Sequence, residues 1–382
     1  MDAGLNPVRI VGAGPVGAVC ALALAQQGIT AHVLEAQPED ARGDTRTLAL
    51  SKGTRLILER LQVWEKLAGV TPITRIHISQ RGALGVTRLD ASALAVPALG
   101  YVLPYADLTA ALKARLREAG MAVEYGVAVE RIDAMADAAT LHTADGRTLT
   151  TPLVVVADGG RGKDTPKPKF ERDYDQMAVV CDVQTELPHA YQAFERFTPD
   201  GPAALLPKGD RYGLVWTASR TEAERIAALP DEAFLAALQR HFGGRQGRFL
   251  TAGPRKAFPL KLAYTGSEAV DRVVRIGNAA QTLHPVAGQG FNIGLRDAWE
   301  LAALAGDTPA DALGSAAMLA AYARGRRADV VGGLSFTDFL VRTFSNDFAP
   351  LRHARGLGLL ALEALPPLKT FVARRMMFGA NG

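Results

Sequence analysis

The residues whose spacing most clearly suggests chemistry lie in the segment Gly277–Gly294, which reads GNAAQTLHPVAGQGFNIG. It follows the apolar run Val273–Ile276 and precedes the helical pattern Leu295–Ala305, so we expect a strand, a loop and then a helix. Gly288 and Gly290 have no side chain to keep a flat ligand off the backbone, and a helix starting here would point free N–H groups at that ligand. Such a loop suits a planar group that gains negative charge, as a flavin ring does when it is reduced.

A second candidate binding motif lies near the start of the chain. Residues Pro7–Val11 are expected to form a strand that runs into the glycine-rich sequence GAGPVG at residues 12–17 and then into a helix that Gly28 ends. A further strand, Thr30–Leu34, is followed directly by Glu35. The order of strand, GxGxxG, helix, strand and acid is the dinucleotide-binding arrangement.

Each residue of this motif has its own expected role. Gly12 allows the tight turn, Gly14 lets a pyrophosphate approach the backbone and Gly17 allows close helix packing. Glu35 would accept hydrogen bonds from a ribose. We therefore predict cofactor contacts from Gly12, Gly14, Pro15, Gly17 and Glu35. The alternative is a strand–helix turn that holds no nucleotide.

The segment 277–294 resembles the flavin-ring segment of the aromatic-ring hydroxylases related to para-hydroxybenzoate hydroxylase. Its order GN-AAQTLHP-AGQGFN-G is similar to that of the ubiquinone-biosynthesis hydroxylases of the 2-polyprenyl-6-methoxyphenol hydroxylase type. The resemblance implies FAD contacts from Asn278, Pro285, Gly288, Gln289, Gly290 and Asn292. No residue declares itself as a catalytic base, and the catalytic residues stay unassigned, with His284 and Gln289 as weak candidates near the flavin.

Two further segments carry the same resemblance. The sequence DTRTLALS at residues 44–51 is similar to a family segment whose arginine lies along the cofactor, which gives Arg46 that role, with Arg42 as a weaker candidate. A solvated loop arginine is the alternative. The apolar run LVVVA at residues 153–157 predicts a buried strand, and it ends at Asp158-Gly159, which resembles the family's Asp-Gly motif at the flavin.

The chain departs from the family directly after this motif. The family usually continues with a serine and then an arginine, whereas this chain reads GRGK at residues 160–163. The flavin contact expected of Asp158 is compatible with that change. The departure leaves the binding mode of the pyridine nucleotide unassigned.

The resemblance implies an FAD-dependent aromatic-ring monooxygenase. NAD(P)H would reduce the bound FAD, O2 would give a C4a-hydroperoxyflavin, and a polyprenylated phenol of ubiquinone biosynthesis would be hydroxylated. Two alternatives stay open at this point. One is a related flavin hydroxylase of another aromatic substrate, and the other is a non-catalytic flavoprotein subunit of a membrane-surface assembly.

The pattern along the chain predicts an α/β fold, with a Rossmann-like FAD-binding domain, an inserted β-sheet substrate domain and a helical C-terminal region. We expect a discontinuous FAD-binding domain at 1–72, 100–164 and 266–330, a substrate domain at 73–99 and 165–265, and a helical region at 331–382. Asp107 is a plausible N-cap of one helix. Five aromatic residues either line the substrate pocket or pack in a core, namely Phe194, Phe197, Tyr212, Trp216 and Phe258.

Composition narrows the function classes. Cys20 and Cys181 both lie in apolar patterns and show neither disulfide nor metal spacing, so we expect core residues in a reducing compartment and no metal. The net charge of +4 is mild and comes without a nucleic-acid-binding motif, so no nucleic-acid partner is expected. No apolar run reaches the roughly 18 residues that a membrane span needs.

The C-terminal residues 335–382 mix basic and apolar side chains. They contain six Lys or Arg against three acids, together with Phe, Leu and Met. Such a mixture suits a membrane surface or partner proteins of ubiquinone biosynthesis, and a helical cap over the cofactor domain is the alternative. We therefore expect a cytoplasmic protein with a peripheral position at the inner membrane surface.

Overall fold

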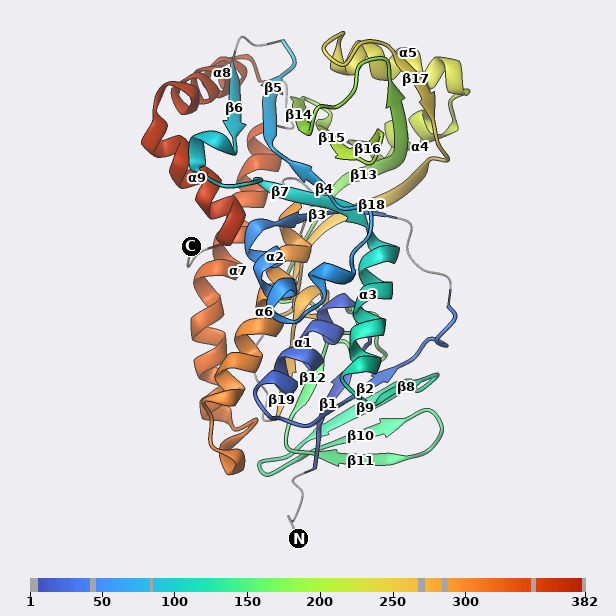
Figure 1. Cartoon of the computed structure of the whole chain (residues 1–382), viewed down its shortest axis with the longest axis vertical. Coiled ribbons are helices and arrows are strands. Elements are labelled where there is room, and N and C mark those ends of the chain that lie inside the picture. Colours follow the sequence, from blue (N-terminus) through green and yellow to red (C-terminus); the bar gives the residue numbers. More distant parts are fainter. Residues whose placement is uncertain are drawn as a thin grey trace.

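The computed structural model describes residues 6–41, 46–82, 85–266, 272–283, 288–344 and 348–379, except for the side chains of 349–352. It confirms the expected α/β class (Figure 1). Helices and parallel strands fill one half of the molecule, and a large mixed sheet covers that half (Figure 1). The domain boundaries expected from the sequence stay a prediction.

The sheet in the first half is parallel, with the strand order β19-β12-β1-β2-β8. Its strands are β1 (Val8–Val11), β2 (Ala31–Glu35), β8 (Val123–Tyr125), β12 (Val154–Val156) and β19 (Val273–Arg275). Helices α1 (Pro15–Gln26), α3 (Tyr105–Glu118) and α6 (Gln289–Gly306) share one hydrophobic core with it. Helix α1 is apolar on every side and largely buried, as expected for a central helix.

Three glycines allow the backbone to pack closely around the start of α1. A Cβ at Gly17 would overlap the carbonyl oxygen of Gly12. A Cβ at Gly277 would lie 3.2 Å from the Val16 side chain, and one at Gly294 would lie 3.0 Å from the Cα of Gly277. The start of α1 and the segment that begins at Gly277 are therefore in direct contact, although they lie far apart in the sequence.

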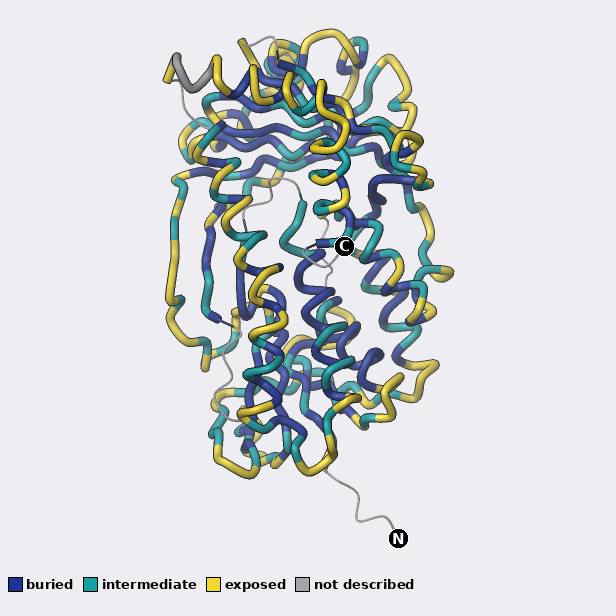
Figure 2. The backbone as a smooth tube through the Cα atoms, turned by 90° about the vertical axis from the view of Figure 1, so that its left-hand side faces the viewer, coloured by how far each residue is buried: buried dark blue, intermediate teal, exposed yellow. Residues whose placement is uncertain are grey.

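The large sheet has the order β20-β18-β13-β16-β15-β14-β5-β6, and β17 pairs with β13. Its strands are β5 (Arg75–Gln80), β6 (Val86–Asp90), β13 (Phe170–Thr185), β14 (Gln192–Thr198), β15 (Gly201–Lys208), β16 (Arg211–Ser219), β17 (Phe249–Ala252), β18 (Lys256–Tyr264) and β20 (Gln281–Thr282). Helices α4 (Arg220–Ala228) and α5 (Asp231–Phe242) pack on its outer face. The inner face looks toward the parallel sheet (Figures 1 and 2).

Two three-stranded sheets complete the β structure. One has the order β11-β10-β9, and the other, β3-β7-β4, lies between the two halves (Figure 1). Their strands are β3 (Thr47–Ser51), β4 (Thr71–Ile73), β7 (Gly100–Pro104), β9 (Val129–Ala134), β10 (Ala139–Thr143) and β11 (Thr148–Thr151). Strand β3 leads into α2 (Lys52–Arg60), and short 3-10 helices occupy Trp64–Lys66, Ser92–Leu94, Gly277–Ala279 and Ala310–Ala312.

The sequence predicted Asp107 as the N-cap of α3, and this prediction is wrong. The helix begins at Tyr105 with Pro104 in the N-cap position, and Asp107 lies inside the first turn. A proline just before a helix already sets the extended backbone that a cap requires, and an acid in the first turn still interacts favourably with the helix dipole.

Three helices form the C-terminal part: α7 (Ala316–Phe344), α8 (Ala349–Ala364) and α9 (Pro366–Phe378). Helix α7 runs along one side of the molecule, and α8 packs against β6 (Figure 1). No single helix in the described ranges is long and apolar enough to cross a membrane. The pair His353–Ala364 and Pro366–Phe378 passes that test together, but it is bent by 97°.

Candidate flavin site

Gly12 and Gly14, in the turn between β1 and α1, have different structural roles. Gly12 has φ +104°, and a Cβ there would lie 2.7 Å from the carbonyl oxygen of Ala157, so only glycine fits against β12. Gly14 has φ −62° and ψ 172°, which any residue adopts, and the nearest atom to a Cβ there is the Tyr105 hydroxyl at 3.9 Å. The protein itself therefore leaves the space beside Gly14 open for a ligand.

Glu35 lies at the end of β2 and contacts this turn. One carboxylate oxygen accepts from the backbone N–H of Ala13 at 2.7 Å, and the other accepts from Gln37 N–H at 2.9 Å. Each carboxylate oxygen can accept a second hydrogen bond, so a ribose hydroxyl can still be bound. Pro15 begins α1, whose first N–H groups have no partner within the helix and point toward the turn.

The second binding segment runs from β19 through the 3-10 helix Gly277–Ala279 and β20 to α6. His284 and Pro285 lie outside the described residues. Gly288 has φ +60° and forms the left-handed N-cap of α6, which explains its identity, whereas a Cβ at Gly290 would make only ordinary contact with Leu283 at 3.5 Å. Gln289 is the first residue of α6, and its side-chain amide donates to the Met376 carbonyl at 3.4 Å.

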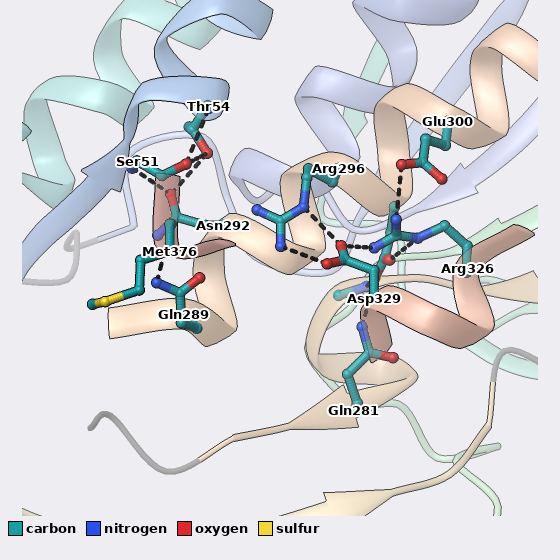
Figure 3. Close-up of polar contacts among 12 residues, drawn as sticks. Ser51, Thr54, Gln281, Gln289, Asn292, Arg296, Glu300, Arg326, Asp329 and Met376 are labelled. Atoms are coloured by element: carbon teal, nitrogen blue, oxygen red, sulfur yellow. Dashed lines mark hydrogen bonds and ion pairs between the residues drawn. The ribbon is translucent and has the colours of Figure 1, made fainter. Parts of the chain in front are cut away.

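The side chain of Asn292 is fully used by the protein (Figure 3). Its oxygen accepts from the Ser51 N–H at 2.8 Å and from the Thr54 hydroxyl at 2.7 Å. Its nitrogen donates to the carbonyl oxygens of Ala49 at 3.0 Å and Gly288 at 2.8 Å. With four hydrogen bonds and 2% exposure, Asn292 ties β3 and α2 to the start of α6, so we assign it a positioning role.

Replacing Asn292 with alanine is expected to lower the free energy of unfolding by about 2–4 kcal/mol, because several buried groups of β3 and α2 lose their partners. Chemical denaturation measures this change, with the exposed Asn6→Ala as the control. FAD should also be released more readily. An Asn292→Ala protein as stable as Asn6→Ala would contradict the positioning role.

The Asp158 carboxylate organises its own loop. One oxygen accepts from the Gly160 N–H at 2.8 Å and the other from the Gly162 N–H at 2.8 Å. Gly159 and Gly160 both have positive φ, and a Cβ at Gly160 would lie 3.2 Å from the carbonyl oxygen of exposed Asn278. The loop at 158–162 and the start of the 277–294 segment therefore lie next to each other.

Arg46 is exposed and lies just before β3. Its guanidinium carbon is 5.8 Å from the centre of the Phe258 ring, in the range of a cation–π contact. Phe194, Tyr212 and Trp216 pack in the outer core of the large sheet, and Phe197 is also buried, so the core-packing alternative holds for these four aromatics.

A buried charge network lies behind the site and was not expected from the sequence (Figure 3). Arg326 on α7 is 1% exposed and bonds to Asp297, Asp329 and Glu300, each at 2.8 Å. Arg296 adds two bonds to Asp329, at 2.7 and 3.2 Å. The only available sequence signal was a pair of adjacent charges, Arg296 and Asp297, inside an otherwise apolar helical pattern.

This network also holds the binding segment. The second oxygen of Asp297 accepts from the backbone N–H of Gly277 at 3.0 Å and from the side chain of Gln281 at 2.6 Å. Asp297 of α6 thereby fixes the 3-10 helix and β20, and Arg326 of α7 holds that carboxylate in place. Burial opposes the charge on Asp329, but hydrogen bonds from Arg296 and the charge of Arg326 hold its pKa at about 2.

A glycine turn with open space at Gly14, an acid at the end of β2 and a long helix starting at a left-handed glycine define an FAD-binding α/β protein covered by a second sheet. The family profile described as "FAD binding domain" matches residues 6–331, so the chain belongs to that FAD-binding family. Together with the relatives below, this makes it an FAD-dependent monooxygenase. FAD is the cofactor and NAD(P)H the co-substrate, and hydroxylation requires O2 and a phenolic substrate.

Curated relatives cover nearly the whole chain. Ubiquinone hydroxylase UbiL of Rhodospirillum rubrum is 36% identical, over 97% of this chain and 89% of the relative. The 3-demethoxyubiquinol 3-hydroxylase of Escherichia coli is 31% identical, over 95% and 96% of the two chains.

Solved structures share the fold. PqsL of Pseudomonas aeruginosa, solved in complex with 2-aminobenzoylacetate, gives a TM-score of 0.77 at 22% identity and covers 94% of this chain and 100% of that chain. HpxO of Klebsiella pneumoniae, complexed with FAD and uric acid, gives a TM-score of 0.75 at 20% identity and covers 98% of each chain.

Proposed function

We propose that this monooxygenase hydroxylates a polyprenylated phenol in ubiquinone biosynthesis. The observation that carries the proposal is the near-full-length likeness to two ubiquinone hydroxylases, and the open space at Gly14 beside Glu35 supports it. When bound, FAD would supply the redox and oxygen chemistry, and the protein supplies binding, orientation and exclusion of water.

The predicted cofactor residues divide into contacts and supports. We propose that Gly12, Gly14, Pro15 and Gly17 present the start of α1 to the pyrophosphate and that Glu35 binds the ribose. Around the ring, Gly288, Gln289 and Gly290 would present the start of α6, where N–H groups favour negative charge. Asp158, Gly159, Asn278 and Arg46 would lie along the cofactor, and Pro285 remains a proposal from the sequence alone.

The substrate class gives a reason for the C-terminal helices. We propose that the bend between α8 and α9 rests on the membrane surface, because five of its large apolar side chains are strongly exposed. These side chains are Leu357 (66%), Leu360 (44%), Leu365 (51%), Leu368 (44%) and Phe371 (65%), and we call them the apolar elbow. Large apolar side chains left exposed on adjacent helices are typical of a membrane or partner contact.

Helix α9 connects the apolar elbow with the candidate site. Phe371 faces outward, whereas Ala373, Met376 and Met377 line a hollow that Gln289 and Asn292 at the start of α6 also line. An isoprenoid chain could therefore remain at the lipid surface while the ring of the substrate reaches the flavin. The apolar and flexible methionine side chains suit such a passage.

Glutamate at two positions of the apolar elbow tests this placement. The double variant Leu368→Glu/Phe371→Glu is expected to lose at least about tenfold in affinity for vesicles of anionic phospholipid. Two apolar side chains that would enter the lipid are replaced by carboxylates, which the anionic lipid repels. Its FAD content should be unchanged. The control is Leu250→Glu, which alters a side chain with 46% exposure on β17 of the large sheet. Equal co-sedimentation of the two variants would exclude the membrane role of the elbow.

The activity itself is tested with purified, FAD-loaded protein, NADH or NADPH, and a phenol carrying a short isoprenyl chain under ¹⁸O2. The expected product is heavier by one oxygen atom from ¹⁸O2, and its formation should consume the nicotinamide cofactor. Reduction of the flavin that yields only hydrogen peroxide, with every phenol of this class tested, would contradict the proposal. Hydroxylation of a non-prenylated aromatic instead would favour the related hydroxylase of another substrate.

A further inference from the structure

Five residues form a row across the inner face of the large sheet, which we call the inner row. Strand pairing aligns them in the order Ile78, Glu195, Ala204, Val215 and Val180. Each of the five keeps partial solvent-accessible surface, whereas neighbours on the same face, including Ala193, Phe197, Gly213 and Thr217, are buried. The partial accessibility of all five, beside buried neighbours, indicates an opening along the inner row, whose members are four apolar side chains and one carboxyl group.

The inner row lies above the candidate flavin site. On one side of it, a Cβ at Gly213 would lie 3.3 Å from Thr47 of β3, and on the other side Phe197 packs on Phe344 of α7. Two residues further along β3, Ala49 contacts Gly288 at the start of α6, at 3.4 Å from a Cβ placed there. The large sheet and the flavin-ring segment are thus both in contact with β3.

Glu195 has no hydrogen bond or ion pair with any residue that the structure describes, although protein atoms surround it. A carboxyl group in an apolar environment is costly unless a partner satisfies it, and such groups concentrate at functional sites. Ligand sites typically combine an apolar lining with a few polar groups that fix orientation, which is the composition of the inner row. A partner that arrives with the ligand would explain the isolated carboxyl group.

We propose that Glu195 is the residue that binds the hydroxyl group of the aromatic substrate, with the other members of the inner row packing against the ring. This inference rests on the proposed function, since it takes the substrate to be a phenol. The contact is a hydrogen bond, and no covalent step is involved. Its effect is to fix which edge of the ring faces the flavin, and orientation of this kind accounts for much of an enzyme's rate enhancement.

The protonation of Glu195 suits this contact. Burial raises the pKa of its carboxyl group to about 8, so at neutral pH the group is largely protonated. A protonated carboxyl group donates through its O–H and accepts through its other oxygen, and a phenol hydroxyl does both as well. Above pH 8 the ionised group only accepts, and it then forms a stronger, charge-assisted hydrogen bond with the phenol O–H.

The experiment compares two proteins with two ligands. The ligands are a phenol with one short isoprenyl chain and its O-methyl ether, which cannot donate a hydrogen bond. Binding of each to FAD-loaded wild type and to Glu195→Ala is measured from the change in the flavin absorption spectrum. Wild type should prefer the phenol by about tenfold or more, and Glu195→Ala should bind both ligands with nearly equal affinity. Glu222→Gln on the outer helix α4, where the carboxylate pairs with Arg225, is the control and should behave as wild type.

Glu195→Gln separates hydrogen bonding from packing. The amide keeps a donor and an acceptor, so its preference for the phenol should stay within about threefold of wild type at pH 7. Between pH 7 and 9 wild type should bind the phenol more tightly as Glu195 ionises, whereas the glutamine variant should show no such change. An unchanged preference in Glu195→Ala, or the same pH profile in Glu195→Gln and wild type, would overturn the inference.

The stability of the variants provides a check on folding. Because the pKa of Glu195 is raised on folding, its ionisation disfavours the native state as the pH rises from 4.5 toward about 8. Glu195→Gln should therefore melt at a higher temperature than wild type at pH 8 and close to it at pH 4.5. If wild type incorporates ¹⁸O into the phenol while Glu195→Ala still prefers the phenol over its O-methyl ether, the role of Glu195 is rejected and the proposed function stands. Absence of hydroxylation in wild type would instead reject the proposed function.

Discussion

Gly14→Val protein is expected to be purified without FAD, although it folds normally. Valine tolerates the backbone angles at Gly14, and among the described residues other than its chain neighbours the nearest atom to the new Cβ is the Tyr105 hydroxyl, at 3.9 Å. The side chain would therefore clash only with a ligand at the start of α1. Overlap of this size costs roughly 3 kcal/mol, which corresponds to about a hundredfold loss of affinity.

Absorbance of the flavin near its visible maximum, relative to protein absorbance, gives the FAD content directly. Gly244→Val is the matched control, because that glycine also has open space around it and lies in the loop after α5. The melting temperature of Gly14→Val should agree with that of Gly244→Val from which the FAD has been removed. Full FAD content in Gly14→Val would show that the pyrophosphate does not approach this turn.

Arg326→Met is expected to lower the free energy of unfolding by about 3–5 kcal/mol, the largest effect that we expect from a single substitution away from the cofactor. The substitution leaves Asp297 buried without its cation and removes one of the two cations that contact Asp329, which keeps Arg296. Methionine has a similar volume, so the loss reflects charge rather than packing. Because Asp297 holds Gly277 and Gln281, the variant should also release FAD faster.

Urea denaturation measures the change, and Arg225→Met on α4 is the control because its ion pair with Glu222 is exposed. Removing an exposed pair of this kind costs up to about 1 kcal/mol. A loss no larger than that in Arg326→Met would mean that the network contributes specificity rather than stability. The double variant Arg326→Met/Asp297→Asn should recover part of the loss, because it removes the buried charge that has lost its cation.

The same network predicts an acid limit of stability. The pKa of Asp329 is lowered from 3.8 to about 2 in the folded protein, so the unfolded chain takes up this proton first. The contribution is complete above pH 4 and is lost as the pH falls toward 2. Between pH 4 and 2, the stability of Asp329→Asn should therefore fall less steeply than that of wild type.

Local patterns were sufficient to predict the nucleotide turn and the fold class. Alternating strands and helices, the three glycines of residues 12–17 and the acid after β2 follow one another within a short stretch, so their geometry depends on neighbouring residues. The strand β19 and the helix α6 on either side of this segment were also predictable, whereas the 3-10 helix Gly277–Ala279 and strand β20 between them were not. The open space at Gly14 was expected, whereas the hydrogen bond from Ala13 to Glu35 was not.

The supporting residues could not be predicted because their partners are distant in the sequence. Asn292 was expected to contact the flavin, yet its side chain is bound to β3 and α2. Glu195 belongs to a strand with mixed polar and apolar residues, and only the pairing with β15 and β5 shows that it faces an apolar space. The departure at residues 160–163 also has a structural meaning, since a Cβ at Gly162 would overlap the Asp158 carboxylate that accepts from its N–H.

The central claim is that this chain adds oxygen to a polyprenylated ring on the route to ubiquinone. The most direct measurement is mass spectrometry of the quinone lipids in a strain that lacks the gene and in the same strain carrying wild type or Gly14→Val. We expect the deletion to lose ubiquinone and to accumulate a precursor one hydroxylation short. Wild type should reverse both changes and Gly14→Val should not. A normal quinone profile in the deletion strain would contradict the account.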